Sequence, residues 1–170
     1  MTKANVSVLV TTFNEELNIE GCLRSVEGWP QEIFVVDSYS TDRTPEIYNR
    51  YGAVVVNALP QRIADLKNWA LDTLPFSAEW VLILDADERV TSALRDEITD
   101  IVTNSKSLDG YYINRRFIFY GKWMRCWYPS WNLRLFKHQL GRYEDRKVHE
   151  HVILNGRAGR LKNDMIHEDR

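Results

Sequence analysis

The stretch that decides the fold is residues 80–88, which read Trp-Val-Leu-Ile-Leu-Asp-Ala-Asp-Glu. A short apolar run that ends abruptly in polar residues predicts a strand buried on both faces of a sheet. Because side chains alternate along a strand, Asp85 and Asp87 are expected to point the same way if the extended geometry persists. Two carboxylates held together at a buried strand end repel each other unless a cation or a charged ligand neutralises them.

This acidic strand end has two interpretations. A divalent ion such as Mg²⁺ takes oxygen ligands and typically uses one or two carboxylates together with substrate phosphates. Alternatively, Asp87 and Glu88 cap a helix that we expect over residues 91–101. The Asp-x-Asp pattern alone does not decide between these two roles, so the preceding sequence has to.

Length and composition limit the class of protein. The 170 residues are 44% hydrophobic and 27% charged, and the net charge is −2. These values predict a single folded domain and give no sign of nucleic-acid binding. The two cysteines, Cys22 and Cys126, match no zinc or redox pattern. No run approaches the roughly 18 apolar residues that span a bilayer, and no secretory signal opens the chain, so we expect a cytoplasmic protein.

Strand and helix patterns alternate along the first half of the chain. Apolar runs predict strands and periodic apolar positions predict helices. The expected strands are residues 6–10, 32–37, 53–56 and 80–85, and the expected helices lie around residues 19–26, 45–51 and 63–74. This alternation predicts an α/β fold with a doubly wound, mostly parallel sheet flanked by helices.

Polar residues follow three of these strands, at residues 11–15, at Asp37 and at residues 85–87. Ligands of doubly wound sheets bind beyond the carboxyl ends of the strands, so we expect one site there. No Gly-x-Gly-x-x-Gly follows the first strand, and the chain contains no P-loop pattern. The remaining class is a sheet edge that holds a nucleotide through carboxylates and a metal.

Three motifs carry a resemblance to a known family. They are residues 8–16 (Val-Leu-Val-Thr-Thr-Phe-Asn-Glu-Glu), residues 33–44 (Ile-Phe-Val-Val-Asp-Ser-Tyr-Ser-Thr-Asp-Arg-Thr) and residues 85–88 (Asp-Ala-Asp-Glu). In this order the set resembles glycosyltransferase family 2, whose members are inverting enzymes with the GT-A fold that use nucleotide-diphosphate sugars. Residues 61–71 and Val148-His149-Glu150 narrow the resemblance to the lipopolysaccharide-core branch.

The resemblance implies a nucleotide pocket, with UDP favoured. The residues it would contain are Thr11, Phe13, Asn14, Glu15, Asp37, Ser38, Lys67 and Asp85. Asp37 would accept a hydrogen bond from the ring N–H of the base, and Asp85 would hold the ribose or a water. Lys67 would add a positive charge beside the phosphates; its alternative is a solvated helix face.

The resemblance also implies a divalent metal, Mg²⁺ or Mn²⁺, that bridges the two donor phosphates. Asp87 would ligate it, and the metal would stabilise the negative charge that develops on the leaving diphosphate. His167 corresponds to a histidine that completes the metal site in some GT-A enzymes; its alternative role is a hydrogen bond to a phosphate.

An inverting transfer needs a base that takes the proton of the acceptor hydroxyl. Glu150, in the Val148-His149-Glu150 pattern, is the first candidate, and Asp145, in the acidic pair with Glu144, is the second. Asp145 also fits a surface acid paired with the neighbouring basic residues 146 and 147, so the sequence leaves the choice open.

The second half predicts an antiparallel portion. Residues 110–114 and 116–120 read as two strands of a hairpin around residues 114–115, and residues 131–137 read as another strand. Aromatic and basic side chains crowd residues 121–131. Aromatic rings can stack on sugars, and rings beside basic residues suit a membrane interface. For most of these rings, the simpler role is to cover the sheet.

We therefore expect one GT-A-like domain over residues 1–170. Residues 1–104 would bind the nucleotide sugar, and residues 105–170 would form the acceptor and catalytic half, which ends earlier than in the relatives. The partners would be a sugar donor and a glycan or lipid-linked glycan acceptor, without nucleic acid. The protein would lie in the cytoplasm, peripheral on the inner face of the cytoplasmic membrane. The alternatives are a non-catalytic nucleotide-sugar-binding module and, with less support because residues 11–16 lack glycine, a nucleotidyltransferase.

Overall fold

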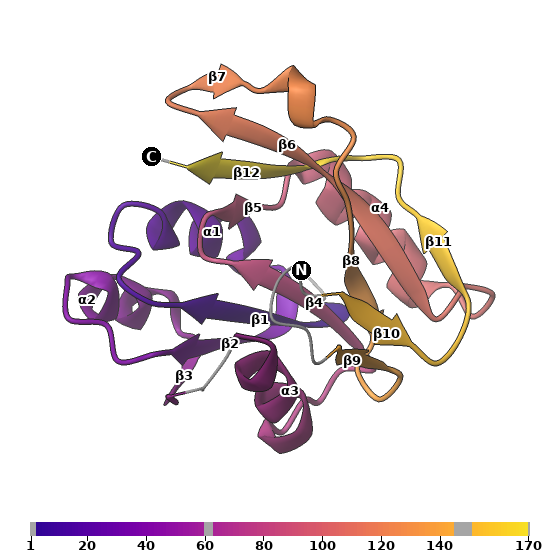
Figure 1. The fold of residues 1–170 in the computed structure, drawn as a ribbon. Coiled ribbons are helices and arrows are strands. Elements are labelled where there is room, and N and C mark those ends of the chain that lie inside the picture. The colour runs from indigo at the N-terminus through magenta and orange to yellow at the C-terminus, as the bar shows by residue number, and fades with distance from the viewer. Residues whose placement is uncertain (1–2, 60–62, 145–150, 170) are drawn as a thin grey trace.

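The computed structural model describes residues 3–59, 63–144 and 151–169 (Figure 1). The first half contains β1 (Ala4–Thr12), α1 (Ile19–Val26), β2 (Pro30–Asp37), α2 (Thr44–Tyr48), η1 (Asn49–Tyr51), β3 (Val54–Asn57), α3 (Ile63–Thr73), β4 (Trp80–Asp85), β5 (Glu88–Arg89) and α4 (Ser92–Thr103). The second half contains β6 (Gly110–Phe119), β7 (Lys122–Trp123), η2 (Arg125–Trp127), β8 (Trp131–Lys137), β9 (Gly141–Tyr143), β10 (Val152–Leu154), β11 (Ala158–Arg160) and β12 (Met165–Asp169).

The first four strands form the parallel part of the large sheet, in the order β3-β2-β1-β4. All three neighbouring pairs are parallel. The carboxyl ends of these strands therefore meet at one edge of the sheet, as the alternation of strand and helix patterns predicted.

Helices cover both faces of this parallel part. Val8, Val10 and other residues of one strand face pack with α1, α2 and α4 in one hydrophobic cluster. Leu9 and its neighbours on the opposite face pack with α3 in a second cluster. Because apolar side chains alternate between two covered faces, the strands read as continuous apolar runs rather than as an alternating pattern. The expected doubly wound sheet flanked by helices is confirmed.

The second half adds antiparallel strands to the same sheet. β8 lies antiparallel between β4 and β6, and β12 lies between β6 and β5. β9 and β10 form a separate antiparallel pair (Figure 1). The Asn68 side chain docks this pair on α3, because it bonds both the N–H and the C=O of Tyr143, at 2.8 and 2.9 Å.

The hairpin predicted around residues 114–115 is wrong, because β6 runs unbroken from Gly110 to Phe119. The polar run Asn-Arg-Arg at its centre resembles a turn in sequence, but each side chain finds a polar partner elsewhere in the chain. Asn114 donates to Asp164, Arg115 pairs with Glu88, and Arg116 pairs with Asp164. The extended backbone then continues from its pairing with β8 to its pairing with β12.

The helix cap proposed for Asp87 and Glu88 is also wrong. Thr91 is the N-cap of α4, and its hydroxyl accepts a hydrogen bond from the N–H of Leu94 at 3.2 Å. Thr91 is the residue type that N-caps favour, and it leaves the two acids free for other contacts. No helix among the described residues is long and apolar enough to cross a lipid bilayer.

Candidate functional site

The polar ends of β1, β2 and β4 lie side by side. The parallel register pairs Thr11 with Asp85 and Thr12 with Asp37. The Thr11 hydroxyl lies 3.5 Å from Asp85 Oδ1. Residues that are 74 positions apart in the chain thus meet at the edge where the sequence predicted a site.

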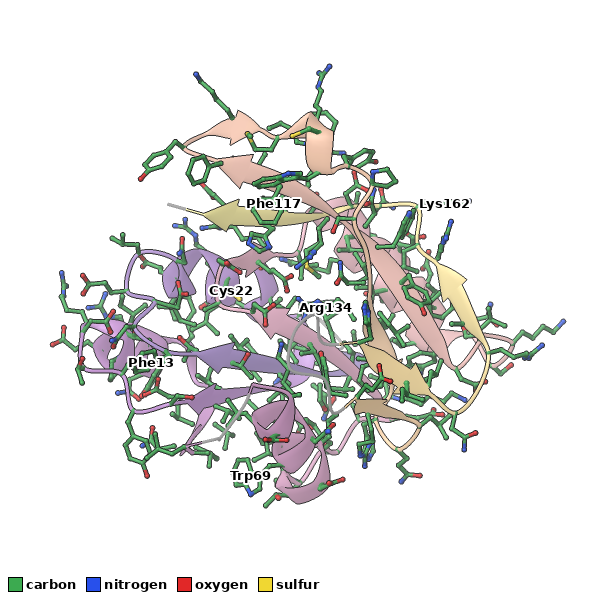
Figure 2. All side chains as sticks on the ribbon, viewed as in Figure 1. Phe13, Cys22, Trp69, Phe117, Arg134 and Lys162 are labelled. Atoms are coloured by element: carbon green, nitrogen blue, oxygen red, sulfur yellow. The ribbon has the colours of Figure 1, made fainter. Side chains whose placement is uncertain are left out.

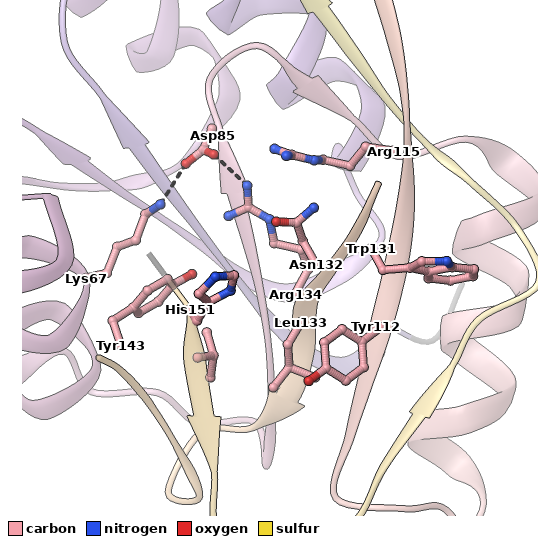
Figure 3. Close-up of a pocket in the computed structure, with 11 residues that line it drawn as sticks. Lys67, Asp85, Tyr112, Arg115, Trp131, Asn132, Leu133, Arg134, Tyr143 and His151 are labelled. Atoms are coloured by element: carbon pink, nitrogen blue, oxygen red, sulfur yellow. Dashed lines mark hydrogen bonds and ion pairs between the residues drawn. The ribbon is translucent and has the colours of Figure 1, made fainter. Parts of the chain in front are cut away.

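Two cavities open at this edge. The first, which we term the N-terminal cavity, has a volume of about 290 Å³ and is lined by Thr11, Thr12, Phe13, Glu15, Ser38, Leu66, Asp85, Ala86 and Asp87. The second, which we term the cationic cavity, has a volume of about 410 Å³ and is lined by Lys67, Asp85, Tyr112, Arg115, Trp131, Asn132, Leu133, Arg134, Tyr143, His151 and Val152 (Figure 3). Asp85 lines both cavities and marks their junction.

The loops after β1 and β2 hold each other at the mouth of the N-terminal cavity. Asn14 Oδ1 accepts from the N–H of Thr41 at 2.8 Å, and the N–H of Asn14 donates to Ser40 Oγ at 2.9 Å. Asn14 and Tyr39 both adopt positive φ angles, 52° and 62°. Such non-glycine conformations persist where the surrounding structure enforces them, which is common at binding sites. The predicted pocket residue Asn14 thus shapes the loops.

Asp37 lies beneath the cavity and does not line it. It is only 2% exposed, and its carboxylate accepts from the N–H and hydroxyl of Ser40, while the Tyr48 hydroxyl lies 3.5 Å away. A carboxylate has about four acceptor positions, so one remains after these three contacts. The expected contact of Asp37 with a base stays a prediction.

Asp85 is held by two cations. Lys67 Nζ lies 2.9 Å from Asp85 Oδ1, and Arg134 Nη2 lies 2.6 Å from Asp85 Oδ2 (Figure 3). Burial raises the pKa of Asp85, but the positive charges of Arg134 and Lys67 outweigh burial and hold that pKa well below its usual range. The carboxylate is therefore ionised throughout the physiological pH range.

Lys67 does not lie on a solvated helix face, which was its alternative reading. It is 3% exposed, and its ammonium also lies over the ring of Tyr143, 5.1 Å from the centroid. A cation that is buried in this way needs a paired negative charge, which Asp85 supplies.

Three members of the charged cluster formed by Lys67, Asp85, Glu88, Arg115 and Arg134 were not predicted as site residues: Glu88, Arg115 and Arg134. Glu88 is fully buried, and its carboxylate pairs with Arg134 at 2.7 Å and Arg115 at 3.3 Å and accepts from the N–H of Asp85 at 2.9 Å. Arg134 joins Asp85 to Glu88 from the centre of the molecule (Figure 2). An arginine between Leu133 and Leu135 in a strand pattern was the one available signal, since it needs a buried acid.

Asp87 and His167 lie together, as their shared metal role implied. The strand β4 ends at Asp85, and Asp87 turns towards β12, where its Oδ2 lies 3.0 Å from His167 Nε2. The His167 ring stacks on Phe117, with centroids 3.9 Å apart. The pairing of β12 with β5 and β6 thus brings a residue 80 positions later in the chain to the acidic motif.

The Asp87–His167 pair fits a divalent ion that is partly held by a substrate. Asp87 Oδ1 and His167 Nδ1 are buried without a partner among the described residues. Within the same residues, no three His, Cys, Asp or Glu side chains gather into a protein-only metal site. Mg²⁺ usually takes one or two carboxylates together with substrate phosphates, so two protein ligands are enough.

The base candidates Asp145 and Glu150 lie outside the described residues. Their neighbours in the chain are described: the N–H of Glu144 donates to the C=O of His151 at 2.8 Å. Tyr143 and His151, which flank this segment in sequence, both line the cationic cavity.

The comparison with known families decides the class of this chain. The family model for glycosyl transferase family 2 matches residues 7–153. The chain belongs to glycosyltransferase family 2. The lipopolysaccharide core biosynthesis glycosyltransferase LpsC of Rhizobium meliloti (strain 1021) is 32% identical over 175 residues, which cover 96% of this chain and 63% of LpsC. LpsC confirms the resemblance to the lipopolysaccharide-core branch, and this chain spans less than two thirds of its length.

Solved structures with bound nucleotides share the fold. S. aureus TarS in complex with UDP superposes with a TM-score of 0.53 and 26% identity over 71% of this chain and 37% of TarS. The mannosyltransferase PcManGT from Pyrobaculum calidifontis, in complex with GDP-Man and Mn²⁺, superposes with a TM-score of 0.55 and 25% identity over 81% of this chain and 45% of the enzyme. The GT-A-type fold that the resemblance implied is confirmed.

Proposed function

We propose that this chain takes a sugar from a nucleotide-diphosphate sugar, with UDP favoured, and transfers it with inversion to a glycan or lipopolysaccharide-core-type acceptor in a metal-dependent reaction. The observation that carries the proposal is that Asp85 lines both cavities. A donor in the N-terminal cavity and an acceptor in the cationic cavity would meet beside this carboxylate, where the sugar would pass from one to the other.

The N-terminal cavity is proposed as the donor site. Its lining offers an exposed aromatic ring, Phe13, together with the polar side chains of Thr11, Glu15 and Ser38. A ring and a few polar groups are what a base and ribose require. TarS with UDP and PcManGT with GDP-Man, both of this fold, support a nucleotide donor.

Asp87 and His167 would hold a divalent metal, Mg²⁺ or Mn²⁺, at the phosphate end of the donor site. The ion would neutralise charge that develops on the leaving diphosphate. Asp87 supplies the hard oxygen ligand, and the Phe117 ring fixes the plane of the His167 imidazole. The Mn²⁺ in PcManGT supports this assignment.

Lys67 would assist the same leaving group. It is held by Asp85 at the junction of the cavities, so its charge is in place before the donor arrives. Fixed charges that do not have to reorganise are the effective ones in a water-poor site. Asp85 would then have two functions, a contact with the ribose or a water and the orientation of Lys67.

The transfer itself would be a single displacement. A base takes the proton of the acceptor hydroxyl, the oxygen bonds to the anomeric carbon, and the bond from that carbon to the diphosphate breaks on the opposite face. Glu150 is the first choice for the base and Asp145 the second. Tyr143 and His151, which bracket both in the chain, line the cationic cavity, and this supports an acceptor site there.

The two halves of the chain would have different functions, donor binding in the first and acceptor binding with catalysis in the second. The N-terminal cavity is lined by residues numbered 11–87, whereas most residues that line the cationic cavity are numbered 112–152. This division supports donor binding by residues 1–104 and acceptor binding and catalysis by residues 105–170.

A peripheral position on the inner face of the cytoplasmic membrane is part of the proposal. Exposed rings gather on one edge of the molecule, formed by the end of β6, β7 and η2 (Figure 2). This aromatic edge consists of Phe119, Tyr120, Trp123, Trp127 and Tyr128, with Lys122 and Arg125 among them. Rings and cations together suit the headgroup region of a bilayer, where a lipid-linked acceptor would be found.

Transfer with base variants tests the proposal. UDP-sugars and deacylated lipopolysaccharide-core oligosaccharides are the substrates, with UDP release and the anomeric configuration of the product as readouts. Glu150→Gln should keep nucleotide binding and lower the transfer rate by about 10²-fold or more, because the proton has no acceptor. Asp145→Asn is the matched control and should lose much less.

Two results of this experiment would count against the proposal. A wild-type rate in Glu150→Gln would remove Glu150 as the base. A product with the anomeric configuration of the donor would exclude the inverting displacement.

A further inference from the structure

The cationic cavity has more hydrogen-bond donors than acceptors. Among the described residues that line it, three carry a positive charge and one carries a negative charge: Lys67, Arg115 and Arg134 against Asp85. Glu88 lies behind them, fully buried. Both oxygens of Asp85 are already bound by Lys67 and Arg134, and both oxygens of Glu88 are bound as well. Three contacts fall on each carboxylate, so each keeps about one of its four acceptor positions, fewer than the N–H donors of the two arginines that remain.

Arg115 and Arg134 have N–H donors, including both Nε atoms, that bond none of the described residues. A guanidinium has five N–H donors. Towards the described residues, Arg134 uses only Nη2, which serves both Asp85 and Glu88. Arg115 makes two long contacts, 3.3 Å to Glu88 and 3.4 Å to Ser130 Oγ. The Tyr143 hydroxyl is buried with no partner among the described residues and adds another donor at this cavity.

Aromatic rings form the opposite part of the lining. Trp131 and Tyr112 lie across the cavity from Lys67 and Tyr143 (Figure 3). Arg160 lies over the Trp131 ring, 4.9 Å from its centroid, and this contact fixes the indole. Sugars pack their apolar C–H faces on aromatic rings, so these two side chains suit a sugar ring whose substituents face the arginines.

We propose that the cationic cavity is an acceptor subsite for a sugar that carries a negatively charged substituent, a carboxylate or a phosphate. The sugar ring packs on Trp131 and Tyr112, and Arg115 with Arg134 binds the charged group. A planar, bidentate guanidinium is the side chain that suits carboxylate and phosphate oxygens best. This inference rests on the proposed function, because it names the chemical class of acceptor at the same junction.

The simpler role for the arginines is to neutralise Asp85 and Glu88. Arg134 alone contacts both acids, so Arg115 is not needed for that purpose. Arg115 is also the more exposed of the two arginines, with 19% of its side chain accessible against 7% for Arg134. Arg115 is thus a second cation with long hydrogen bonds that reaches the cavity surface. Binding of a negatively charged ligand explains its position better than neutralisation of the two acids does.

Calorimetric titration of the purified chain, saturated with UDP and Mn²⁺, tests the inference. The probes are glucose 6-phosphate, glucuronate, glucose and inorganic phosphate. At least one anionic sugar should bind about tenfold or more tightly than glucose and than inorganic phosphate, as expected for a charge-assisted hydrogen bond added to ring packing. The tighter of glucose 6-phosphate and glucuronate identifies the charged group as phosphate or carboxylate.

Arg115→Gln should reduce the affinity for the anionic sugar to that for glucose, and Arg115→Lys should give an intermediate value. Lys162→Gln, which removes an exposed lysine away from the cavity, should change nothing (Figure 2). Unchanged binding of UDP with Mn²⁺ to Arg115→Gln shows that this variant is folded and that the donor site is separate.

The inference is overturned if glucose and the anionic sugars bind alike, or if Arg115→Gln keeps the preference. It is also overturned if the anionic sugar competes with UDP, because the cations would then serve the donor phosphates. A wild-type chain that binds anionic sugars but no nucleotide would instead contradict the proposed function. The two failures therefore give different results.

Discussion

Glu32 is a carboxylate that ties three segments of the chain together. It accepts hydrogen bonds from the hydroxyl of Ser7 on β1 and from the N–H and hydroxyl of Ser77, which precedes β4. Burial raises the pKa of Glu32, but these hydrogen bonds outweigh burial, and the net pKa lies below its ordinary value. The ionised form is therefore favoured more in the folded than in the unfolded chain.

Glu32→Gln should lower the free energy of unfolding by about 1.5 kcal/mol at pH 7, the lower end of the range for a hydrogen bond to a charged group. A depressed folded-state pKa stabilises above the unfolded value of about 4.3, and this contribution is lost as the pH falls through the lower folded-state pKa. Urea unfolding of both proteins from pH 7 to about pH 3 checks this. A difference between the two proteins that stays constant over this range contradicts the role of Glu32.

At the residue scale, the sequence predicted the site residues that lie inside recognisable motifs. It predicted fewer of the contacts between residues that are far apart in the chain. Asp85, Asp87 and their neighbours follow a recognisable strand, and the Asp87–His167 pair was anticipated through the family resemblance. Arg134 was missed because its partner Glu88 is 46 residues earlier in the chain, and no local pattern records that separation. Pairings of this kind depend on how strands are ordered in the sheet.

At the element scale, α4 depends on a single cap. Thr91 Oγ1 accepts from the N–H of Leu94 and donates to the C=O of Asp164, so it satisfies the helix start and ties it to the segment before β12. Thr91→Ala should lower the free energy of unfolding by about 1 kcal/mol.

Urea unfolding of Thr91→Ala, Thr91→Ser and the exposed control Ser105→Ala measures this effect. Thr91→Ser keeps the hydroxyl and should recover most of the loss, whereas Ser105→Ala should stay within about 0.5 kcal/mol of the wild type. An unchanged Thr91→Ala would mean that the α4 start is satisfied by other groups.

The strands of the first half were predictable because each carries an apolar run between polar residues, and the boundaries moved by only a few positions. β6 was divided wrongly for a physical reason. Asn114, Arg115 and Arg116 look like a turn when their partners Glu88 and Asp164 are unknown. Polar side chains whose partners lie far away in the chain therefore make a strand look like a turn, because local polarity alone indicates a turn.

At the scale of the whole molecule, the aromatic edge should direct the chain to anionic membranes. Replacing both Lys122 and Arg125 by Gln should weaken binding to vesicles that contain phosphatidylglycerol by about thirtyfold, since each cation near such a surface contributes about 1 kcal/mol. Flotation of the chain with vesicles at low salt measures this. Replacing Lys106 and Lys162 by Gln removes the same charge elsewhere and should leave binding unchanged. Equal loss in the two variants would mean that net charge, rather than this edge, attracts the membrane.

The overall architecture was predictable from the order of elements and from the family motifs, and the two cavities were not. A cavity forms where side chains from distant segments leave space, and the cationic cavity draws on α3, β4, β6, β8, β9 and β10. Sequence patterns identified the carboxyl edge of the sheet, but they could not show that Asp85 stands between two separate spaces.

Nucleotide binding by this chain should depend on a metal that Asp87 holds. Calorimetric titration with UDP in the presence of Mn²⁺, repeated after EDTA, tests it most directly, with Asp87→Ala and His167→Ala as variants and Asp100→Ala, on the surface of α4, as the control. We expect UDP to bind the wild type and Asp100→Ala only with Mn²⁺, Asp87→Ala to lose binding, and His167→Ala to need more Mn²⁺. Equal UDP binding after EDTA, or by Asp87→Ala, would contradict the account.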